Sequence, residues 1–198
     1  MQQRMKAEDR RRQLLEVAAE VFAQRGYRGA TTAELANAAG ITEPILYRHF
    51  DNKLNLFTTL IDEVGSAVID AWKQALAACK TPTQRFDALI AGNPATHARG
   101  RGVYRVIFQA MTEAEGEPEI NDAIRSHLER LHRFLTRELA DLQKAGMIRD
   151  DEPAASQAWL MMHLAIGYGM VSPLGVAGHT KHASARQVHD LLLEHLGA

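Results

Sequence analysis

The 198-residue chain contains a single cysteine, Cys79, and this scarcity excludes whole classes of protein. One thiol can form neither an internal disulfide nor a metal centre built from several thiolates. Aromatic residues make up only 6% of the chain, although apolar residues reach 46%. Since much of this apolar content is alanine and leucine, which lose little side-chain freedom in a helix, the composition predicts a well-packed helical protein.

Long apolar runs and targeting signals are also missing. Residues 158–171 form the most apolar stretch, but it is short for a membrane span and contains His163, so it predicts a buried helix. The first 12 residues are basic and have no apolar centre, which argues against a signal peptide. We therefore expect a protein of the reducing cytoplasm that makes no contact with a membrane.

Signatures of enzymes and metal centres are sparse. The glycines are scattered and form no phosphate-cradling loop, and residues 113–117 form an acidic turn without an evident pair of catalytic carboxylates. His179 and His182 have a spacing seen in zinc sites, but they lie in a glycine-rich stretch with no cysteine nearby, which favours surface histidines. We predict no metal and no cofactor, and we keep an enzyme only as a second hypothesis.

Charge is distributed unevenly on a chain whose net charge is −1. Residues 1–12 carry five basic side chains against two acidic ones, whereas the acidic excess lies downstream, for example at residues 113–122. A basic arm on a nearly neutral chain suggests one end that binds a polyanion. A solvated tail explains the arm equally well.

Apolar residues recur at helical spacing along most of the chain, and strand-like alternation is nearly absent. Glycine, proline and threonine mark the ends of the apolar stripes. The pattern predicts an all-α protein with about nine helices and short connections. The expected helices are one ending at Gly26, one from Thr31 or Thr32 to Ala39, one capped by Thr42, and then 52–76, 83–91, 102–112, 119–145, 153–171 and 183–196.

Residues 32–50 have the proportions of a helix-turn-helix. Gly40 lies in the turn between two short helices, and the small side chains of Ala36 and Ala39 allow a close crossing. Polar and partly basic side chains lie between the apolar positions of the second short helix, which suits a DNA groove. They are Thr42, Glu43, Pro44, Tyr47, Arg48 and His49.

This region resembles the DNA-binding signature of the TetR family of bacterial regulators, at matching spacing over roughly the first 57 residues. The resemblance rests on Thr31-Thr32-Ala33-Glu34-Leu35-Ala36, Ala39-Gly40-Ile41-Thr42, Leu46-Tyr47-Arg48-His49-Phe50, Lys53, and Leu56-Phe57. It implies a helix-turn-helix domain over residues 1–53 and a helical ligand-binding and dimerisation domain over residues 54–198. The implied protein is a homodimeric repressor, released from a palindromic double-stranded DNA operator by a small-molecule effector.

The resemblance also implies roles for single residues. Tyr47 and His49 match the family's phosphate-contacting pair, and Lys53 matches a lysine that meets the DNA backbone; Thr32 is expected to do the same. Glu43 and Pro44 take positions where base contacts usually occur, although Glu43 departs from the more common basic or amide residue. A carboxylate accepts from the cytosine amino group, and a proline ring touches a thymine methyl group. Arg48 is expected to reach a guanine or a phosphate.

The C-terminal two thirds carry no comparable signature. The family implies a pocket among the middle helices, although core packing explains each candidate side chain as well or better. The candidates are Trp72, Phe86, Tyr104, Phe108, Met111, Met162 and His163. The last two helices are the expected dimer interface, with an internal core helix as the alternative for the eighth. The expected interface residues are Ala165, Gly169, Val188, Leu191, Leu192 and His195. A DNA-binding adaptor that dimerises without a ligand is a third hypothesis.

Overall fold

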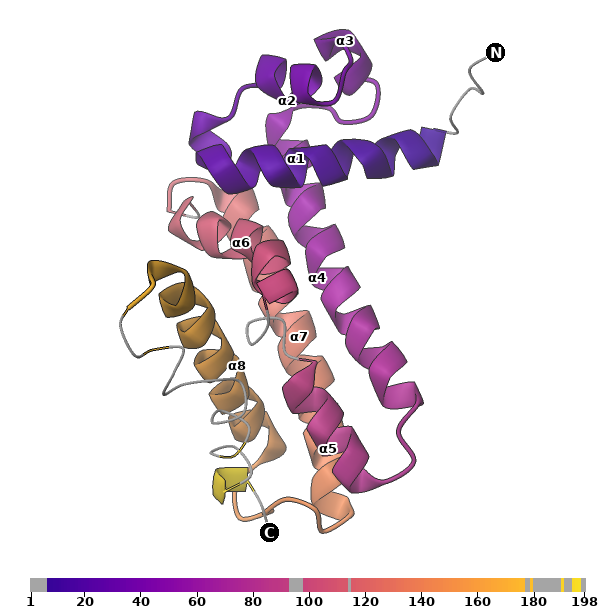
Figure 1. The fold of residues 1–198 in the computed structure, drawn as a ribbon, viewed down its shortest axis with the longest axis vertical. Coiled ribbons are helices and arrows are strands. Elements are labelled where there is room, and N and C mark those ends of the chain that lie inside the picture. Colours follow the sequence, from indigo (N-terminus) through magenta and orange to yellow (C-terminus); the bar gives the residue numbers. More distant parts are fainter. Residues whose placement is uncertain are drawn as a thin grey trace. The chain divides into compact units, whose positions relative to one another are not determined.

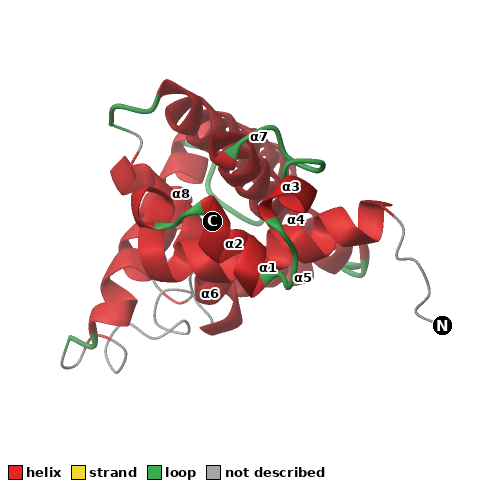
Figure 2. Cartoon of the chain, turned by 90° about the horizontal axis from the view of Figure 1, so that it is seen from above, coloured by secondary structure: helices red, strands yellow, loops and turns green. Residues whose placement is uncertain are grey.

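The computed structural model describes residues 7–92, 98–113, 115–176, 179, 190 and 194–196. Within these ranges the chain forms eight α-helices and one 3-10 turn, joined by loops, and contains no β-strand (Figure 2). The all-α prediction is confirmed.

The helices lie where the sequence pattern predicts them, to within about one turn. They are α1 (Ala7–Gly29), α2 (Thr32–Ala38), α3 (Glu43–Leu46), α4 (Lys53–Ala77), α5 (Pro82–Ala91), α6 (Ala98–Glu113), α7 (Pro118–Lys144) and α8 (Ala154–Val171), followed by the 3-10 turn η2 (Ser172–Leu174) (Figure 1). The predicted ninth helix, 183–196, lies mostly outside the described residues. Of that segment, residues 190 and 194–196 are described, and they are helical.

The chain divides into two compact units, and three helices contribute to both of them. Unit 1 comprises Met1–Val64 and Arg105–Ser126, and unit 2 comprises Gly65–Tyr104 and His127–Ala198. Unit 1 therefore contains the predicted DNA-binding residues together with the first half of α4, the end of α6 and the start of α7. The functional boundary at residue 53 stays a prediction.

In unit 1, α1 lies below α2 and α3 in the view of Figure 1, and its apolar residues Leu14, Ala18 and Phe22 are buried. Phe22 is fully buried and meets the ring of Phe57 edge-on, with ring centres 4.7 Å apart; Tyr27 lies 5.0 Å from the same ring. Gly26 interrupts the helical conformation of α1 with φ 71° and ψ 172°. Because only glycine adopts such angles without strain, the predicted stop at Gly26 is a bend that sends residues 27–30 toward α2.

The start of α2 is fixed by a reciprocal cap. The hydroxyl of Thr31 accepts a hydrogen bond from the backbone N–H of Glu34 at 3.2 Å, and the Glu34 carboxylate accepts from the N–H of Thr31 at 3.0 Å. This capping box satisfies two donors that have no partner within the helix. The carboxylate of Glu34 accepts this backbone hydrogen bond and a second one from the Thr31 hydroxyl at 3.1 Å, and both lower the pKa of Glu34. Thr31, rather than Thr32, is thus the capping residue.

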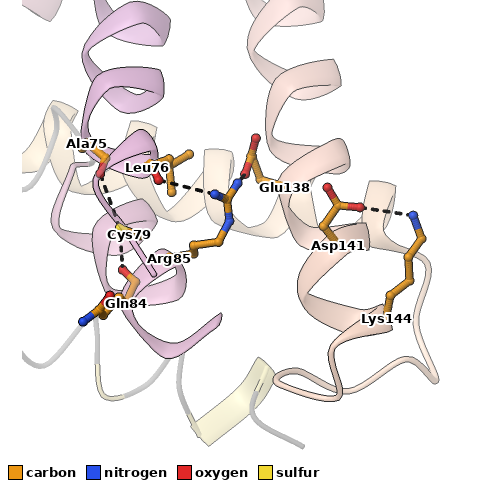
Figure 3. A network of polar contacts seen from close by, with 8 residues as sticks. All are labelled: Ala75, Leu76, Cys79, Gln84, Arg85, Glu138, Asp141 and Lys144. Carbon is orange, nitrogen blue, oxygen red and sulfur yellow. Dashed lines mark hydrogen bonds and ion pairs between the residues drawn. The ribbon is translucent and has the colours of Figure 1, made fainter. Parts of the chain in front are cut away.

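In unit 2, an arginine of α5 joins three helices (Figure 3). The Arg85 guanidinium forms an ion pair with Glu138 of α7 and donates to the backbone oxygen of Leu76, near the end of α4, at 3.4 Å. The Leu76 oxygen also accepts from the backbone N–H of Cys79, just past the helix, at 3.1 Å, so Arg85 adds a second donor at the end of α4 and ties α4 to α7.

None of the helices in the described part of the chain is long and apolar enough to span a bilayer.

Candidate nucleic-acid interface

The polar residues predicted to bind DNA lie on the exposed side of α3 and of the turn that follows it. Thr42, Pro44, Tyr47 and Arg48 are exposed, whereas Glu43 and His49 are half-buried. Leu46 and Phe50 lie beneath them and are almost fully buried. The Tyr47 ring is 46% exposed, so it is not a core aromatic residue. The structure therefore presents a polar ridge, residues 42–49, on an apolar base, as a groove-reading segment requires.

The start of this ridge is joined to α2 by a side-chain hydrogen bond. Thr32 Oγ1 donates to Glu43 Oε2 at 2.5 Å, so two predicted DNA-contacting residues contact each other. Thr42 occupies the N-cap position of α3, but its hydroxyl makes no capping hydrogen bond, and the first turn is set by Pro44 instead. The predicted side-chain cap by Thr42 is therefore wrong.

The end of the ridge is joined to α1 by Arg11. Its Nη1 donates to the backbone oxygen of His49 at 2.5 Å, and its guanidinium carbon lies 4.3 Å from the centre of the Phe50 ring. Stacking on an aromatic face adds a cation–π attraction to the hydrogen bond. The sequence predicted only a basic N-terminal arm; one of its arginines is a positioning residue for the recognition segment.

Lys53 has a structural task that the sequence did not reveal. Its Nζ donates to the backbone oxygens of Tyr27 and Ala30, both at 2.9 Å, and lies 4.4 Å from the centre of the Tyr27 ring. Two of the three N–H donors of the ammonium thus hold residues 27–30, the bent end of α1 and the residue after it, which leaves one donor for a phosphate. The phosphate contact stays a prediction, now alongside a positioning role.

Glu113, at the end of α6, holds the same segment through its N–H groups. The two carboxylate oxygens accept from the N–H of Tyr27 at 2.8 Å and of Arg28 at 3.0 Å. Arg28 in turn donates to the backbone oxygen of Glu115 at 3.2 Å. A side chain at Gly26 would collide with Glu113, since an added Cβ would come within 2.5 Å of Oε1. The acidic turn predicted from the sequence therefore begins with a carboxylate that caps the bend in α1.

The same surroundings affect the Tyr27 side chain. Burial raises the pKa of its hydroxyl, and the nearby charges of Glu117, Glu113 and Glu119 raise it further. Tyr27 therefore stays neutral at physiological pH, which suits a ring that packs against the rings of Phe22 and Phe57.

We expect Lys53→Met to lower the free energy of unfolding by about 2 kcal/mol and to weaken binding to every DNA sequence alike. Methionine keeps the apolar stem but removes a charged donor from two carbonyls, a loss of about 1.5–3 kcal/mol per hydrogen bond before exposure is considered. Urea unfolding and fluorescence anisotropy with duplex DNA measure the two effects.

Lys73→Met is the matched control, because Lys73 is an exposed α4 residue that pairs only with Asp70 of its own helix. It should leave both quantities nearly unchanged. Weaker DNA binding by Lys53→Met at unchanged stability would mean that Lys53 acts on phosphate alone.

The residues predicted for a ligand pocket are divided between the two units. Phe108 and Met111 are half-buried in unit 1, whereas Trp72, Phe86, Tyr104 and Met162 are buried in unit 2, and His163 is exposed on α8. Trp72 is already committed to packing: Nε1 donates to the backbone oxygen of Leu89 at 3.1 Å, and the ring stacks on Phe134 at 5.9 Å. Ligand contact by these side chains stays a prediction.

A buried tyrosine–histidine pair lies in unit 2. The Tyr104 hydroxyl lies 2.9 Å from Nε2 of His127, whose side chain is 0% exposed. Burial raises the pKa of the Tyr104 hydroxyl, which therefore remains protonated. Leu128, the neighbouring apolar residue of α7, is only half-buried. His127, three residues after Ile124 and four before Leu131, takes the buried position.

The α8 residues predicted for the dimer interface are not the ones whose large side chains are exposed, and their contact with a second subunit stays a prediction. Ala165 is half-buried and Gly169 is buried. Large apolar side chains instead emerge at Trp159, Leu164, Met170 and Val171, and they continue past α8 at Leu174 and Val176. We call this set the α8 apolar face. His163 belongs beside it, because its ring stacks on Trp159 at 5.7 Å.

Of the other residues predicted for the dimer interface, only His195 lies within the described part of the chain. Val188, Leu191 and Leu192 lie outside the described residues. His195 is exposed and lines a shallow groove with Arg149, Ser156 and Gln157. Arg149 and Leu196, which both line this groove, are joined by a backbone hydrogen bond from the N–H of Arg149 to the oxygen of Leu196 at 2.7 Å.

Metal ligands do not cluster in the described ranges: no group of three or more histidine, cysteine, aspartate or glutamate side chains there can hold an ion. His182, the second member of the predicted histidine pair, lies outside those ranges.

An exposed polar ridge on a helix-turn-helix, within an all-α chain, defines a helix-turn-helix DNA-binding regulator. Comparison with known families agrees. The model of bacterial regulatory proteins of the tetR family matches residues 14–60, and the model of the C-terminal domain of BetI-type transcriptional repressors matches residues 82–198. The chain belongs to the TetR family.

Individual relatives match different lengths of the chain. It is 34% identical over 106 residues to the transcriptional activator FasR of Mycolicibacterium smegmatis, an alignment covering 54% of this chain and 48% of FasR. It is 43% identical over 61 residues to the repressor KstR2 of Rhodococcus jostii, covering 31% of this chain and 28% of KstR2. The regulator BetI of Brucella canis is 26% identical over 161 residues, 78% of this chain and 79% of BetI. The alignments thus span less than half of FasR and of KstR2.

Solved structures share the fold along nearly the whole chain. A protein of Saccharomonospora viridis in complex with choline superposes with a TM-score of 0.82 at 22% identity, covering 96% of this chain and 99% of the other. AibR in complex with isovaleryl coenzyme A and operator DNA superposes with a TM-score of 0.70 at 21% identity, covering 94% and 97%.

Proposed function

We propose that this TetR-family regulator acts in the cytoplasm as a homodimeric repressor of a palindromic DNA operator and is released by a small-molecule effector. The observation that carries the proposal is the polar ridge of residues 42–49. Most of its polar side chains are exposed, and Glu43 and His49 are half-buried, above the buried side chains of Leu46 and Phe50. Hydrogen bonds from Thr32 and from Arg11 fix its two ends. A preorganised polar segment of this kind binds a groove without first having to become ordered.

Repression, rather than activation, is supported by the match of residues 82–198 to the BetI-type repressor domain. The effector is proposed without a fixed chemistry, because the same fold holds choline in one protein and isovaleryl coenzyme A in another. A thermal-shift screen against metabolites separates this proposal from the adaptor hypothesis, in which no metabolite stabilises the protein.

The dimer follows from the α8 apolar face and from the geometry of DNA. One recognition segment reads only a short half-site, and a two-fold dimer places two of them about 34–36 Å apart, or a multiple of that distance. The α8 apolar face gathers large exposed apolar side chains from Trp159 to Val176. Large exposed apolar side chains gathered on one helix and the turn after it favour an interaction surface, and an identical subunit offers the same side chains in return.

We expect the purified protein to protect a palindromic site in its own promoter region and to lose affinity steeply as salt rises. Since bound phosphates release counterions, six to ten phosphate contacts predict a loss of about 10³- to 10⁵-fold between 50 and 200 mM salt. Footprinting locates the site, and anisotropy titrations at graded salt measure the slope. A scrambled duplex of equal length is the control. Absence of a footprint even at low salt would refute the proposed function.

A further inference from the structure

We infer that Thr32 positions the carboxylate of Glu43 to read a cytosine at one base pair of each half-site. This inference rests on the proposed operator binding and adds to it a specificity-determining pair. In the pair, Glu43 contacts the base and Thr32 acts through Glu43.

The two residues occupy equivalent places on neighbouring helices. Thr32 is the first residue of α2 and Glu43 is the first residue of α3. The hydrogen bond from Thr32 Oγ1 to Glu43 Oε2, at 2.5 Å, spans the helix-turn-helix from one helix start to the other. A free glutamate side chain samples many rotamers, whereas this bond restricts Glu43 and directs its carboxylate.

Both ends of this hydrogen bond are attached to a fixed backbone. The Thr31–Glu34 capping box anchors the first turn of α2. Pro44 restricts the first turn of α3, and the turn between the helices is closed by a hydrogen bond from the N–H of Ile41 to the oxygen of Ala36 at 3.0 Å. The carboxylate position is therefore a property of the folded module rather than of a mobile side chain.

A carboxylate in the major groove discriminates between bases because it cannot donate a hydrogen bond. Ionised, it only accepts hydrogen bonds, and Oε2 already accepts one from Thr32, which leaves capacity at Oε1. Cytosine presents its amino donor in the major groove, whereas guanine and thymine present acceptor oxygens that repel a carboxylate. Adenine offers an amino donor next to the N7 acceptor, so it is the poorer partner.

The negative charge also has a cost near DNA, and that cost supports a role in specificity. Glu43 lies in a ridge whose neighbours, Arg48 and His49, are suited to phosphate and base contacts. A carboxylate there is repelled by the phosphates on every sequence. Only a duplex with a donor opposite Glu43 offsets the repulsion, so the residue weakens binding to incorrect sites more than to correct ones.

Selection from randomised duplexes with the full-length wild type, Thr32→Val, Glu43→Gln and the double variant tests the inference. The wild type should select cytosine at one position of each half-site. Glu43→Gln should lose this preference, and Thr32→Val, which keeps the shape but removes the hydroxyl, should reduce it about fivefold. In the Glu43→Gln background the Thr32→Val substitution should change the preference no further, because its effect passes through Glu43.

Thr58→Val is the matched control, since the Thr58 hydroxyl donates only to Leu54 and Asn55 of its own helix. The base preference of the Thr58→Val variant should equal that of the wild type. Circular dichroism verifies that all variants are folded. If Thr32→Val lowers affinity for all duplexes equally and retains the cytosine preference, Thr32 contacts phosphate and the inference is wrong. A folded wild type that binds no duplex would instead refute the proposed function itself.

Discussion

Replacing Gly65 with alanine should lower the free energy of unfolding by about 2–6 kcal/mol, a large effect for the addition of one methyl group. Gly65 is buried in α4, and an alanine Cβ would lie 2.2 Å from Nδ1 of His127. His127 is fully buried and bonded to Tyr104, so it cannot turn away without breaking that hydrogen bond. Overpacking costs about 1–3 kcal/mol, and a disrupted buried hydrogen bond adds about 1–3 kcal/mol. Urea unfolding measures the sum.

Two further variants show whether the collision with His127 is the cause. Ser66→Ala changes the next, exposed residue of α4 and should alter stability by no more than about 0.5 kcal/mol. In Gly65→Ala/His127→Ala the added methyl group has room, so the double variant should be more stable than the sum of the two single effects predicts. Strict additivity would show that the helix tolerates a methyl group at position 65 and that the close approach is unimportant.

The DNA-binding half of the fold could be predicted from the sequence because its signals are local. Gly40, with φ 65°, lies between two short helices, and the capping residues and the apolar base at Leu46 and Phe50 lie within one 20-residue window. Each of these features depends on residues only a few positions apart, so it can be predicted from the spacing of residue types in the sequence.

The contacts that position the helix-turn-helix join residues far apart in the sequence, and the sequence pattern did not predict them. Glu113 is 86 residues from Tyr27, and Lys53 is 26 residues from it. A surface lysine and an acidic turn are ordinary features of a solvated chain, and nothing in their spacing shows that both bind residues 27–30. Only the bend at Gly26 explains the arrangement, because it exposes the N–H groups to Glu113 and the carbonyl groups to Lys53.

The orientation of α8 could not be predicted for a different reason. Its sequence is apolar nearly all round, so periodicity does not indicate which side is buried. Small residues at Ala165 and Gly169 suggested a close helix crossing, and the structure turns Gly169 inward while Leu164 and Met170 emerge. The exposed side is therefore a finding of the structure, and it directs the interface experiment to different residues.

The double variant Leu164→Asp/Met170→Asp should be a folded monomer that has lost most of its operator affinity. Leu164 is 42% exposed and Met170 is 50% exposed, so in the single subunit the new charges remain in water and the fold is retained. In a dimer joined through the α8 apolar face, the same charges would be buried against an apolar partner and against their own copies. Linking two half-site readers gains about 10²- to 10⁴-fold in affinity, and the monomer should lose that factor.

Sedimentation velocity measures the assembly, and anisotropy with a full palindrome and with a single half-site measures binding. Ala67→Asp, which places the same charge on an exposed position of α4, is the matched control and should remain dimeric. The affinity of the double variant for a single half-site should stay close to that of the wild type, because residues 42–49 are unchanged. The loss of affinity for the full palindrome would then come from separating the two DNA-binding subunits. A double variant that still sediments as a dimer would place the subunit interface elsewhere on the chain.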